Sequence, residues 1–100
     1  MVDEHVGKAV EAALTPIVAS LAAWGVGDAH WLPDSAGAPV IWLRTRTRRQ
    51  ADALVSQVWL PPQVQVTLTR LGVPHDLVWK IRIEVTSAEA EDQLFRDGPG

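Results

Sequence analysis

The chain of 100 residues contains no cysteine. This absence excludes disulfides, thiolate nucleophiles and cysteine-ligated zinc, and it is typical of proteins from a reducing compartment. Asparagine and tyrosine are also absent, lysine occurs twice, and phenylalanine and methionine occur once each. Because alanine, valine, leucine and arginine are abundant instead, the composition is typical of a GC-rich bacterial gene.

The chain also lacks a basic amino-terminal segment and long apolar runs. Its first residues, MVDEHVGK, carry acids where a signal peptide has its basic region. No uninterrupted apolar run approaches the length of a membrane span. The net charge of −3 argues against general binding to nucleic acids or anionic membranes. These features predict a soluble cytoplasmic protein with no membrane partner.

The balance of residue types predicts one folded domain. Apolar residues make up 47% of the chain and charged residues 21%, as in ordinary globular proteins. A chain of this length buries roughly two-thirds of the surface that its unfolded form exposes, which suffices for one core. We expect a single α+β domain over residues 1–96 and a flexible tail at 97–100.

The first half of the chain predicts a long helix followed by a β-hairpin. Apolar residues at helical spacing cover residues 3–24, and the apolar stripe keeps its phase across Pro16, which favours one kinked helix over two. Segments 28–32 and 38–45 then flank Pro-Asp-Ser-Ala-Gly, a sequence typical of a turn. They predict two antiparallel strands joined by a short loop.

The segment from residue 38 to 60 joins a strand directly to a helix. Val40–Leu43 is an apolar run typical of a strand buried on both faces. Thr47 and Gln50 have capping-box spacing, which predicts a helix start. The helix is expected from Arg48 to about Trp59, with one apolar stripe formed by Ala51, Leu54, Val55, Val58 and Trp59.

Residues 61–72 fit two different structures. Valine and leucine alternate with polar residues from 64 to 69, as in a strand, yet the same apolar residues also share one helical face. Pro61-Pro62 before the segment and Gly72 after it are typical of a helix start and stop. We prefer the helix. A strand over 63–71 would instead produce a four-stranded αββαββ arrangement.

The last third predicts a third strand and a short carboxy-terminal helix. Apolar residues alternate with charged ones from Val78 to Thr86, so one face of this strand is expected in the core. At a sheet edge this strand would either pair with a strand of a second copy or, through its charges, discourage such pairing. Thr86 and Glu89 have capping-box spacing for the last helix, whose expected anchors are Leu94 and Phe95.

Four arginines gather where the second strand becomes a helix, namely Arg44, Arg46, Arg48 and Arg49. Positive side chains at a helix N-terminus oppose the helix dipole, and such local conflicts are most frequent at functional sites. The functional interpretation is a surface that binds a phosphate, a carboxylate or an acidic protein. The structural alternative is pairing with acids elsewhere in the chain, for which the candidates are Asp28, Asp34, Glu89, Glu91 and Asp92.

Tryptophan is the dominant aromatic residue, with five copies. We expect Trp42, Trp59 and Trp79 in the core, because each falls on an apolar strand or helix face. Trp24 and Trp31 bracket one loop, and they either join the core or line a pocket or an interface, where tryptophan is enriched.

The sequence shows no convincing catalytic or metal-binding set. Asp28 and His30 share one face of the first strand, but their spacing matches no zinc signature, and Asp34 is explained by the turn. No serine lies in a nucleophile elbow, and no phosphate-loop glycines accompany the arginines. We therefore expect no catalytic residue, no metal and no cofactor.

The preferred function is a non-catalytic protein–protein interaction or accessory module, as a homodimer or docked on a larger protein. The expected contact surface consists of Arg44, Arg46, Arg48, Arg49, Trp24 and Trp31. An alternative is a binder of a small anionic ligand, or a small enzyme, that uses the same arginines. Nucleic-acid binding is a third interpretation, which the acidic net charge disfavours.

Overall fold

The structure is a computed structural model that describes residues 4–97, and side chains as far as residue 93. Its elements confirm the expected α+β class and show a helix, not a strand, over most of residues 61–72. In chain order they are α1 (Glu4–Leu21), the 3-10 turn η1 (Ala22–Trp24), β1 (Val26–Pro33), β2 (Pro39–Thr45), α2 (Arg48–Val55), α3 (Leu60–Arg70), α4 (His75–Val78), β3 (Arg82–Ser87) and α5 (Ala88–Asp97).

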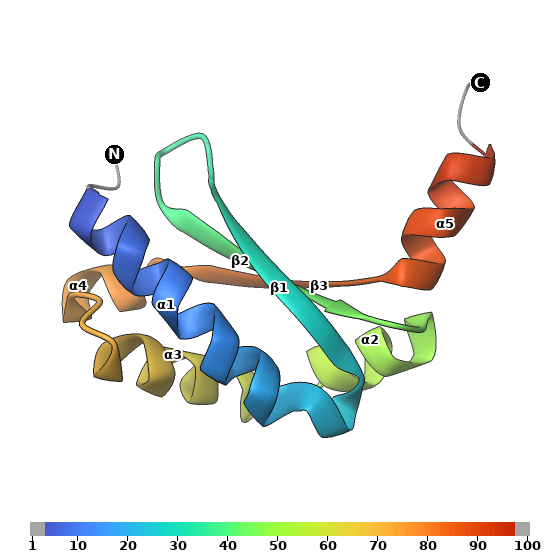
Figure 1. The fold of residues 1–100 in the computed structure, drawn as a ribbon, viewed down its shortest axis with the longest axis horizontal. Helices are drawn as coiled ribbons and strands as arrows, with labels where there is room; N and C mark the ends of the chain where they lie inside the picture. The colour runs from blue at the N-terminus through green and yellow to red at the C-terminus, as the bar shows by residue number, and fades with distance from the viewer. Residues whose placement is uncertain (1–3, 98–100) are drawn as a thin grey trace.

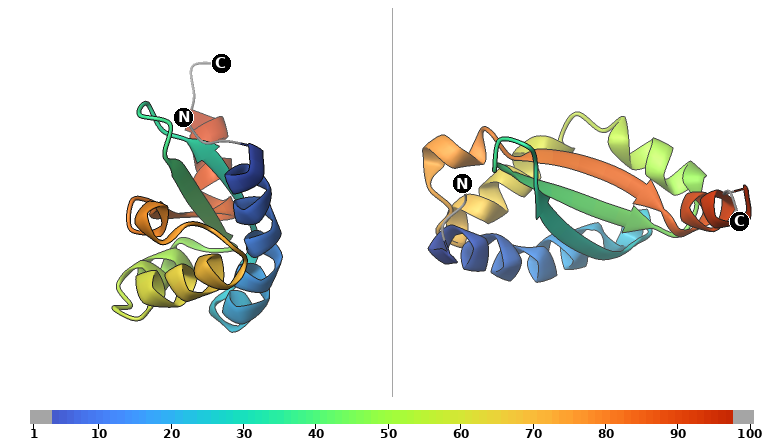
Figure 2. Two further views of the ribbon diagram at one scale, coloured as in Figure 1. Left: turned by 90° about the vertical axis from the view of Figure 1, so that its left-hand side faces the viewer. Right: turned by 90° about the horizontal axis from the view of Figure 1, so that it is seen from above.

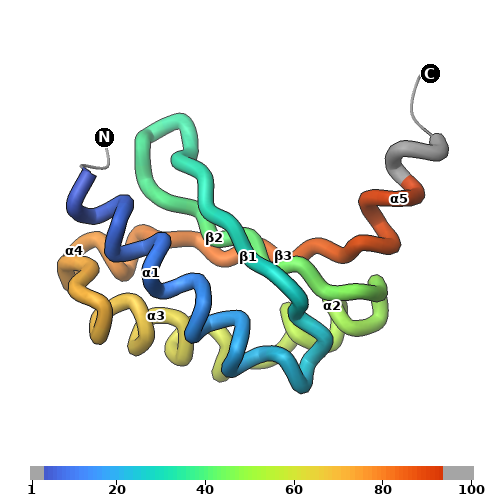
Figure 3. The backbone as a smooth tube through the Cα atoms, in the orientation of Figure 1, coloured from blue at the N-terminus to red at the C-terminus, as the bar shows by residue number. Residues whose placement is uncertain are grey.

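The three strands form one mixed sheet in the order β1-β2-β3. The hairpin strands β1 and β2 are antiparallel, whereas β3 runs parallel to β2. A parallel neighbour requires a crossover connection, which here passes through α2, α3 and α4 before the chain enters β3 (Figure 3). As a result β2 is the central strand, and β3 lies at an edge of the sheet.

Helices cover only one face of this sheet. Helices α1 and α3 pack side by side beneath it (Figure 1), and seen from above the three strands have no helix in front of them (Figure 2). Helix α5 extends away from the body at the far end of β3. The covered face holds the core, whose least exposed apolar residues are Val10, Ala13, Ile41, Leu43, Leu54 and Leu68.

Helix α1 is the long amino-terminal helix that the periodicity predicts. It runs through Pro16 as one element, and Pro16 lies on its exposed side. Together with η1 it is long and apolar enough, by length and composition alone, to cross a membrane, a test that the core helix of a soluble protein also passes. Its buried residues pack against the sheet and α3, which identifies the apolar stripe as part of the core.

The start of α2 is confirmed, but its end is not. The hydroxyl of Thr47 accepts from the Gln50 amide at 3.2 Å, and Oε1 of Gln50 accepts from the Thr47 amide at 3.1 Å. The helix ends at Val55 instead of near residue 59, and Val58 is 90% exposed. The side chains of Ser56 and Gln57 both donate to the Ala53 carbonyl, which helps to end the helix there.

The predicted strand from Val78 to Thr86 is wrong in its first half. A helical turn, α4, occupies residues 75–78, and β3 begins only at Arg82. The Pro74 carbonyl accepts from the amides of Leu77 and Val78, so the buried side chains are Val78 and Ile81, three residues apart. Trp79 therefore leaves the core and is 66% exposed.

The predictions for Trp42 and for the last helix also need correction. Trp42 lies on the open sheet face, because it alternates with Ile41 and Leu43, which face the core. The start of α5 is capped by Ser87, whose hydroxyl accepts from the Ala90 amide at 3.0 Å, one residue later than the expected Thr86. The expected anchors Leu94 and Phe95 lie outside the described side chains, and the expected tail falls at and beyond the last described residue.

Candidate functional site

The arginines occupy the end of β2 and the first turn of α2. Arg44 pairs in the sheet with Asp28 of β1 and Thr86 of β3, on the open face. Arg46, Arg48 and Arg49 follow, and all three are exposed. The structure thus brings the predicted arginines to one corner, but it separates them into one strand residue and three residues at the helix start.

Arg44 is held by acids of the same chain. Its Nη1 lies 3.2 Å from Oδ2 of Asp28, and its Nε lies 2.7 Å from Oε2 of Glu91 in α5. The Nε and Oε2 atoms are buried and form an ion contact that lacks hydrogen-bond geometry. Arg44 therefore pairs with acids of its own chain, as the structural alternative predicts, and both partners are among the candidate acids named from the sequence. These ion pairs link β1, β2 and α5.

Replacing Arg44 by glutamine is expected to loosen α5. The ion pair with Glu91 joins this helix to β2, so amide hydrogen exchange at residues 88–93 is expected to accelerate when the pair is lost. Global stability is expected to fall by only about 1 kcal/mol or less, because the partners are about two-fifths exposed. Arg82→Gln, at an exposed position of β3, is the control. Equal exchange rates in both variants would show that Arg44 does not hold the helix.

Arg46, Arg48 and Arg49 differ from Arg44 because no acid pairs with them. Among residues 4–93 no carboxylate oxygen lies within 4.0 Å of their guanidinium nitrogens. The backbone carbonyl of Arg46 accepts from the Glu89 amide at 3.2 Å, which ties this corner to the start of α5. Three exposed cations without a partner in the described part of the chain therefore share one corner.

This corner does not form a ready-made binding site for a small anion. Oε1 of Gln50 already accepts from the backbone amides of Arg46 and Thr47, and the backbone amide of Gln50 donates to the Thr47 hydroxyl. A hollow of about 220 Å³ beside the corner is lined by Asp28 as well as by Arg44 and Arg46. Asp28 pairs with Arg44 there, so the hollow holds a carboxylate beside Arg46, and Arg48 and Arg49 do not line it.

The two candidate tryptophans lie on different elements, Trp24 at the end of η1 and Trp31 on β1. Trp24 packs against Trp59 with ring centroids 5.3 Å apart, and its neighbour Gly25 approaches Gln50 of α2, so Trp24 lies at the arginine end. The indole nitrogen of Trp31 donates instead to Glu11 of α1 at 3.0 Å. Both rings are half-buried against the core. The structure does not join them into one surface.

The polar residues of the hairpin each have a separate structural partner. Asp28 pairs with Arg44, and the His30 ring stacks parallel to Trp42, with centroids 6.3 Å apart. The Asp34 carboxylate accepts from the amides of Ala36 and Ala38, as expected for a turn. Within the described residues no three acidic or histidine side chains converge on a possible metal site.

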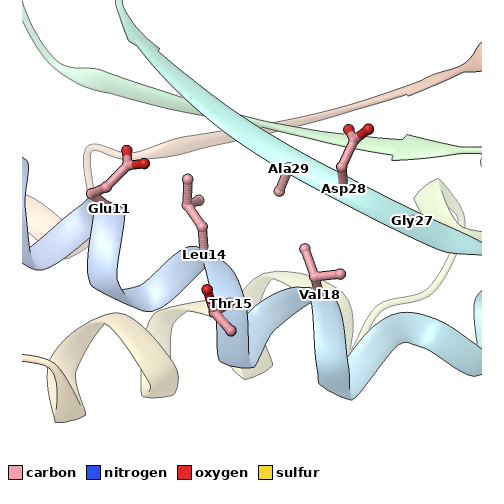
Figure 4. A pocket seen from close by; sticks show the side chains of 7 residues that line it. All are labelled: Glu11, Leu14, Thr15, Val18, Gly27, Asp28 and Ala29. Atoms are coloured by element: carbon pink, nitrogen blue, oxygen red, sulfur yellow. The ribbon is translucent and has the colours of Figure 1, made fainter.

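Two hollows were not predicted from the sequence. One, of about 290 Å³, lies between α1 and β1, with an aliphatic floor and the carboxylates of Glu11 and Asp28 at its rim (Figure 4). The other, of about 400 Å³, lies between α3 and α4. The second depends on the exposure of Trp79, which strand alternation assigns to the core. The sequence signal for this second hollow is Pro74, which favours a helix start, followed by His75 and Trp79 at helical spacing.

Comparison with protein-family models, with curated proteins and with solved structures finds no match to this chain. Any functional conclusion must therefore come from the residues themselves.

Proposed function

We propose that this chain is a non-catalytic protein-interaction module that binds an acidic protein through Arg46, Arg48 and Arg49. The observation that carries the proposal is that these three arginines are exposed and unpaired among the described residues, while the neighbouring Arg44 forms ion pairs with Asp28 and Glu91. Exposed charges of one sign speed the encounter with an oppositely charged partner and select against others. We place the module in the bacterial cytoplasm, as its composition suggests.

A protein partner fits the corner better than a small anion or a nucleic acid. The capping box already uses the backbone amides of Thr47 and Gln50. Asp28 lines the adjacent hollow, so a small phosphate bound there would meet a carboxylate as well as the arginine side chains. Three arginines neutralise about three phosphates of a nucleic acid, which is too few for tight binding by a domain of net charge −3.

Reversing two charges by Arg48→Glu with Arg49→Glu is expected to weaken binding of an oligoglutamate peptide about tenfold or more at low salt. The fold is expected to stay intact, because both side chains are exposed. Fluorescence anisotropy of labelled peptide measures the affinity, and circular dichroism reports the fold. The matched control is Lys8→Glu with Arg82→Glu, which changes the net charge equally at exposed positions elsewhere.

The outcomes separate the candidate functions. Equal affinity in both double variants would reject the corner as the binding surface, and loss of the folded dichroism signal would show that the arginines are structural. A rise in Tm with tripolyphosphate but no binding of the peptide would favour the small-anion function. A dimer that dissociates at high salt, measured by light scattering after size exclusion, would make a second copy the acidic partner.

A further inference from the structure

An apolar groove lies between α3 and α4, at the end of the molecule opposite to the arginines (Figure 1). Its volume is about 400 Å³. Two of its side chains are large, apolar and exposed, namely Trp79 at 66% and Val66 at 51%. Tryptophan is among the residues that contribute most to protein interfaces. An exposed tryptophan beside a hollow of this size indicates a binding surface.

Trp79 is held in one orientation. Its indole nitrogen donates to Nε2 of His75 at 3.1 Å, and the two rings meet edge to face with centroids 5.8 Å apart. The floor beneath them is Val78, which is 2% exposed and part of the core. Because the ring is already ordered, a partner that packs against it loses less conformational entropy on binding.

Two exposed basic residues follow lining residues of the groove in the sequence. Arg70 follows the lining residue Thr69 on α3, and Lys80 follows Trp79. Both are exposed, and in the region that the structure describes neither forms an ion pair. One exposed acid, Asp76, follows the lining residue His75 in the same way, so basic residues outnumber acidic ones two to one among these neighbours of the lining. An occupant that is apolar at its centre and acidic at its margin would complement this surface.

We propose that the groove binds an amphipathic helical segment of another protein, with apolar side chains against Trp79 and Val66 and acidic side chains toward Arg70 and Lys80. The α3 wall runs from Pro62 to Thr69, about 10 Å at the rise of an α-helix, which matches two turns of a bound helix. Helices commonly bind to proteins in this way, through apolar anchors one turn apart. The proposal goes beyond the arginine corner and is independent of it.

A second copy of the chain is a poor occupant for the same groove. A two-fold contact would place hollow against hollow, and it would bring Arg70 and Lys80 of one copy toward the same charges of the other. The groove alone also offers little area compared with the roughly 800 Å² per partner that stable dimers bury. Charge and shape therefore both favour a different, acidic partner.

The test uses a synthetic helical peptide that carries leucines one turn apart flanked by glutamates. In ¹⁵N NMR titrations its amide shift changes are expected to cluster at residues 62–70 and 75–80. Trp79→Ala is expected to weaken the peptide about tenfold or more. The control Val58→Ala removes another exposed apolar side chain, outside the groove, and is expected to leave the affinity unchanged. Circular dichroism verifies that both variants fold.

The charge of the occupant is tested separately. A matched peptide with lysines in place of the glutamates is expected to bind several-fold more weakly than the acidic peptide. Arg70→Glu with Lys80→Glu is expected to reverse this preference. If Trp79→Ala fails to fold, Val66→Asp at the half-exposed wall of α3 serves in its place.

Three results would overturn the proposal. Equal peptide affinity in the Trp79→Ala and Val58→Ala variants would exclude the groove as the site. Binding of anilinonaphthalene sulfonate, a small dye with apolar rings and one negative charge, that depends on Trp79 and is not accompanied by binding of the peptide would identify a small-molecule site. A dimer that depends on Trp79, detected by light scattering, would show that a second copy covers the groove.

Discussion

Replacing Leu43 by alanine is expected to lower the free energy of unfolding by about 3 kcal/mol. Leu43 has no exposed surface, and it lies on the core face of the central strand between Ala29 of β1 and Val85 of β3. The side chain is therefore enclosed by neighbours that cannot close the cavity without moving whole elements. In a domain of this size such a loss is a large part of the total stability.

The same substitution at Leu32 is the matched control. Leu32 lies on β1 in the same sheet, but on the open face, where 55% of it is exposed. Its replacement by alanine is expected to cost less than about 1 kcal/mol, because little apolar surface returns to water. Urea unfolding followed by circular dichroism measures both values. Similar losses in the two variants would mean that the two sheet faces are buried alike.

Replacing Gly25 by alanine is expected to cost about 2 to 3 kcal/mol. Gly25 has a φ of +92°, a conformation that disfavours any residue with a Cβ atom. A Cβ there would also lie 2.3 to 2.5 Å from the terminal atoms of the Gln50 side chain. Gln50 has no free movement, because its Oε1 accepts from the amides of Arg46 and Thr47 in the cap of α2. The substitution therefore strains the turn and breaks the cap.

Three further variants, Gly72→Ala, Gln50→Ala and the double variant Gly25→Ala with Gln50→Ala, separate the cost of the backbone strain from the cost of the broken cap. Gly72 has a φ of +97°, but a Cβ there meets nothing within 4 Å, so Gly72→Ala is expected to cost only about 1 kcal/mol. In a Gln50→Ala background, Gly25→Ala is expected to cost no more free energy of unfolding than Gly72→Ala does, because the Gln50 side chain that a Cβ at position 25 would meet is gone. An excess that persists in this background would place the strain elsewhere. Thermal and urea unfolding measure all four variants.

The helix starts and the hairpin could be predicted because their signals are local. The capping box of Thr47 and Gln50, the stripe of α1 and the turn after Pro33 each lie within a few residues of one another. The segment 78–81 could not be predicted, because alternation over a few residues fits a strand as well as the helical turn that Pro74 begins. The wrong prediction placed Trp79 in the core, whereas in the structure its side chain is 66% exposed.

The candidate site was predicted in position but not in chemistry. The four arginines do gather at one corner, yet which of them is neutralised depends on Asp28 and Glu91, residues far along the chain in either direction. Trp24 and Trp31 were expected to share a loop surface, and their partners Trp59 and Glu11 place them apart. The binding role of these residues stays a prediction.

The sequence by itself determined the class of the fold, the start of α2 and the order of the elements other than α4, because periodicity and capping act between residues within one or two turns. Only the tertiary structure decided that β3 runs parallel to β2 and that Trp79 borders a groove. It also decided that Arg44 is paired while, within residues 4–93, Arg46, Arg48 and Arg49 have no acidic partner. These properties arise from contacts between segments distant in the chain, whose free energies depend on packing and burial that no local pattern records.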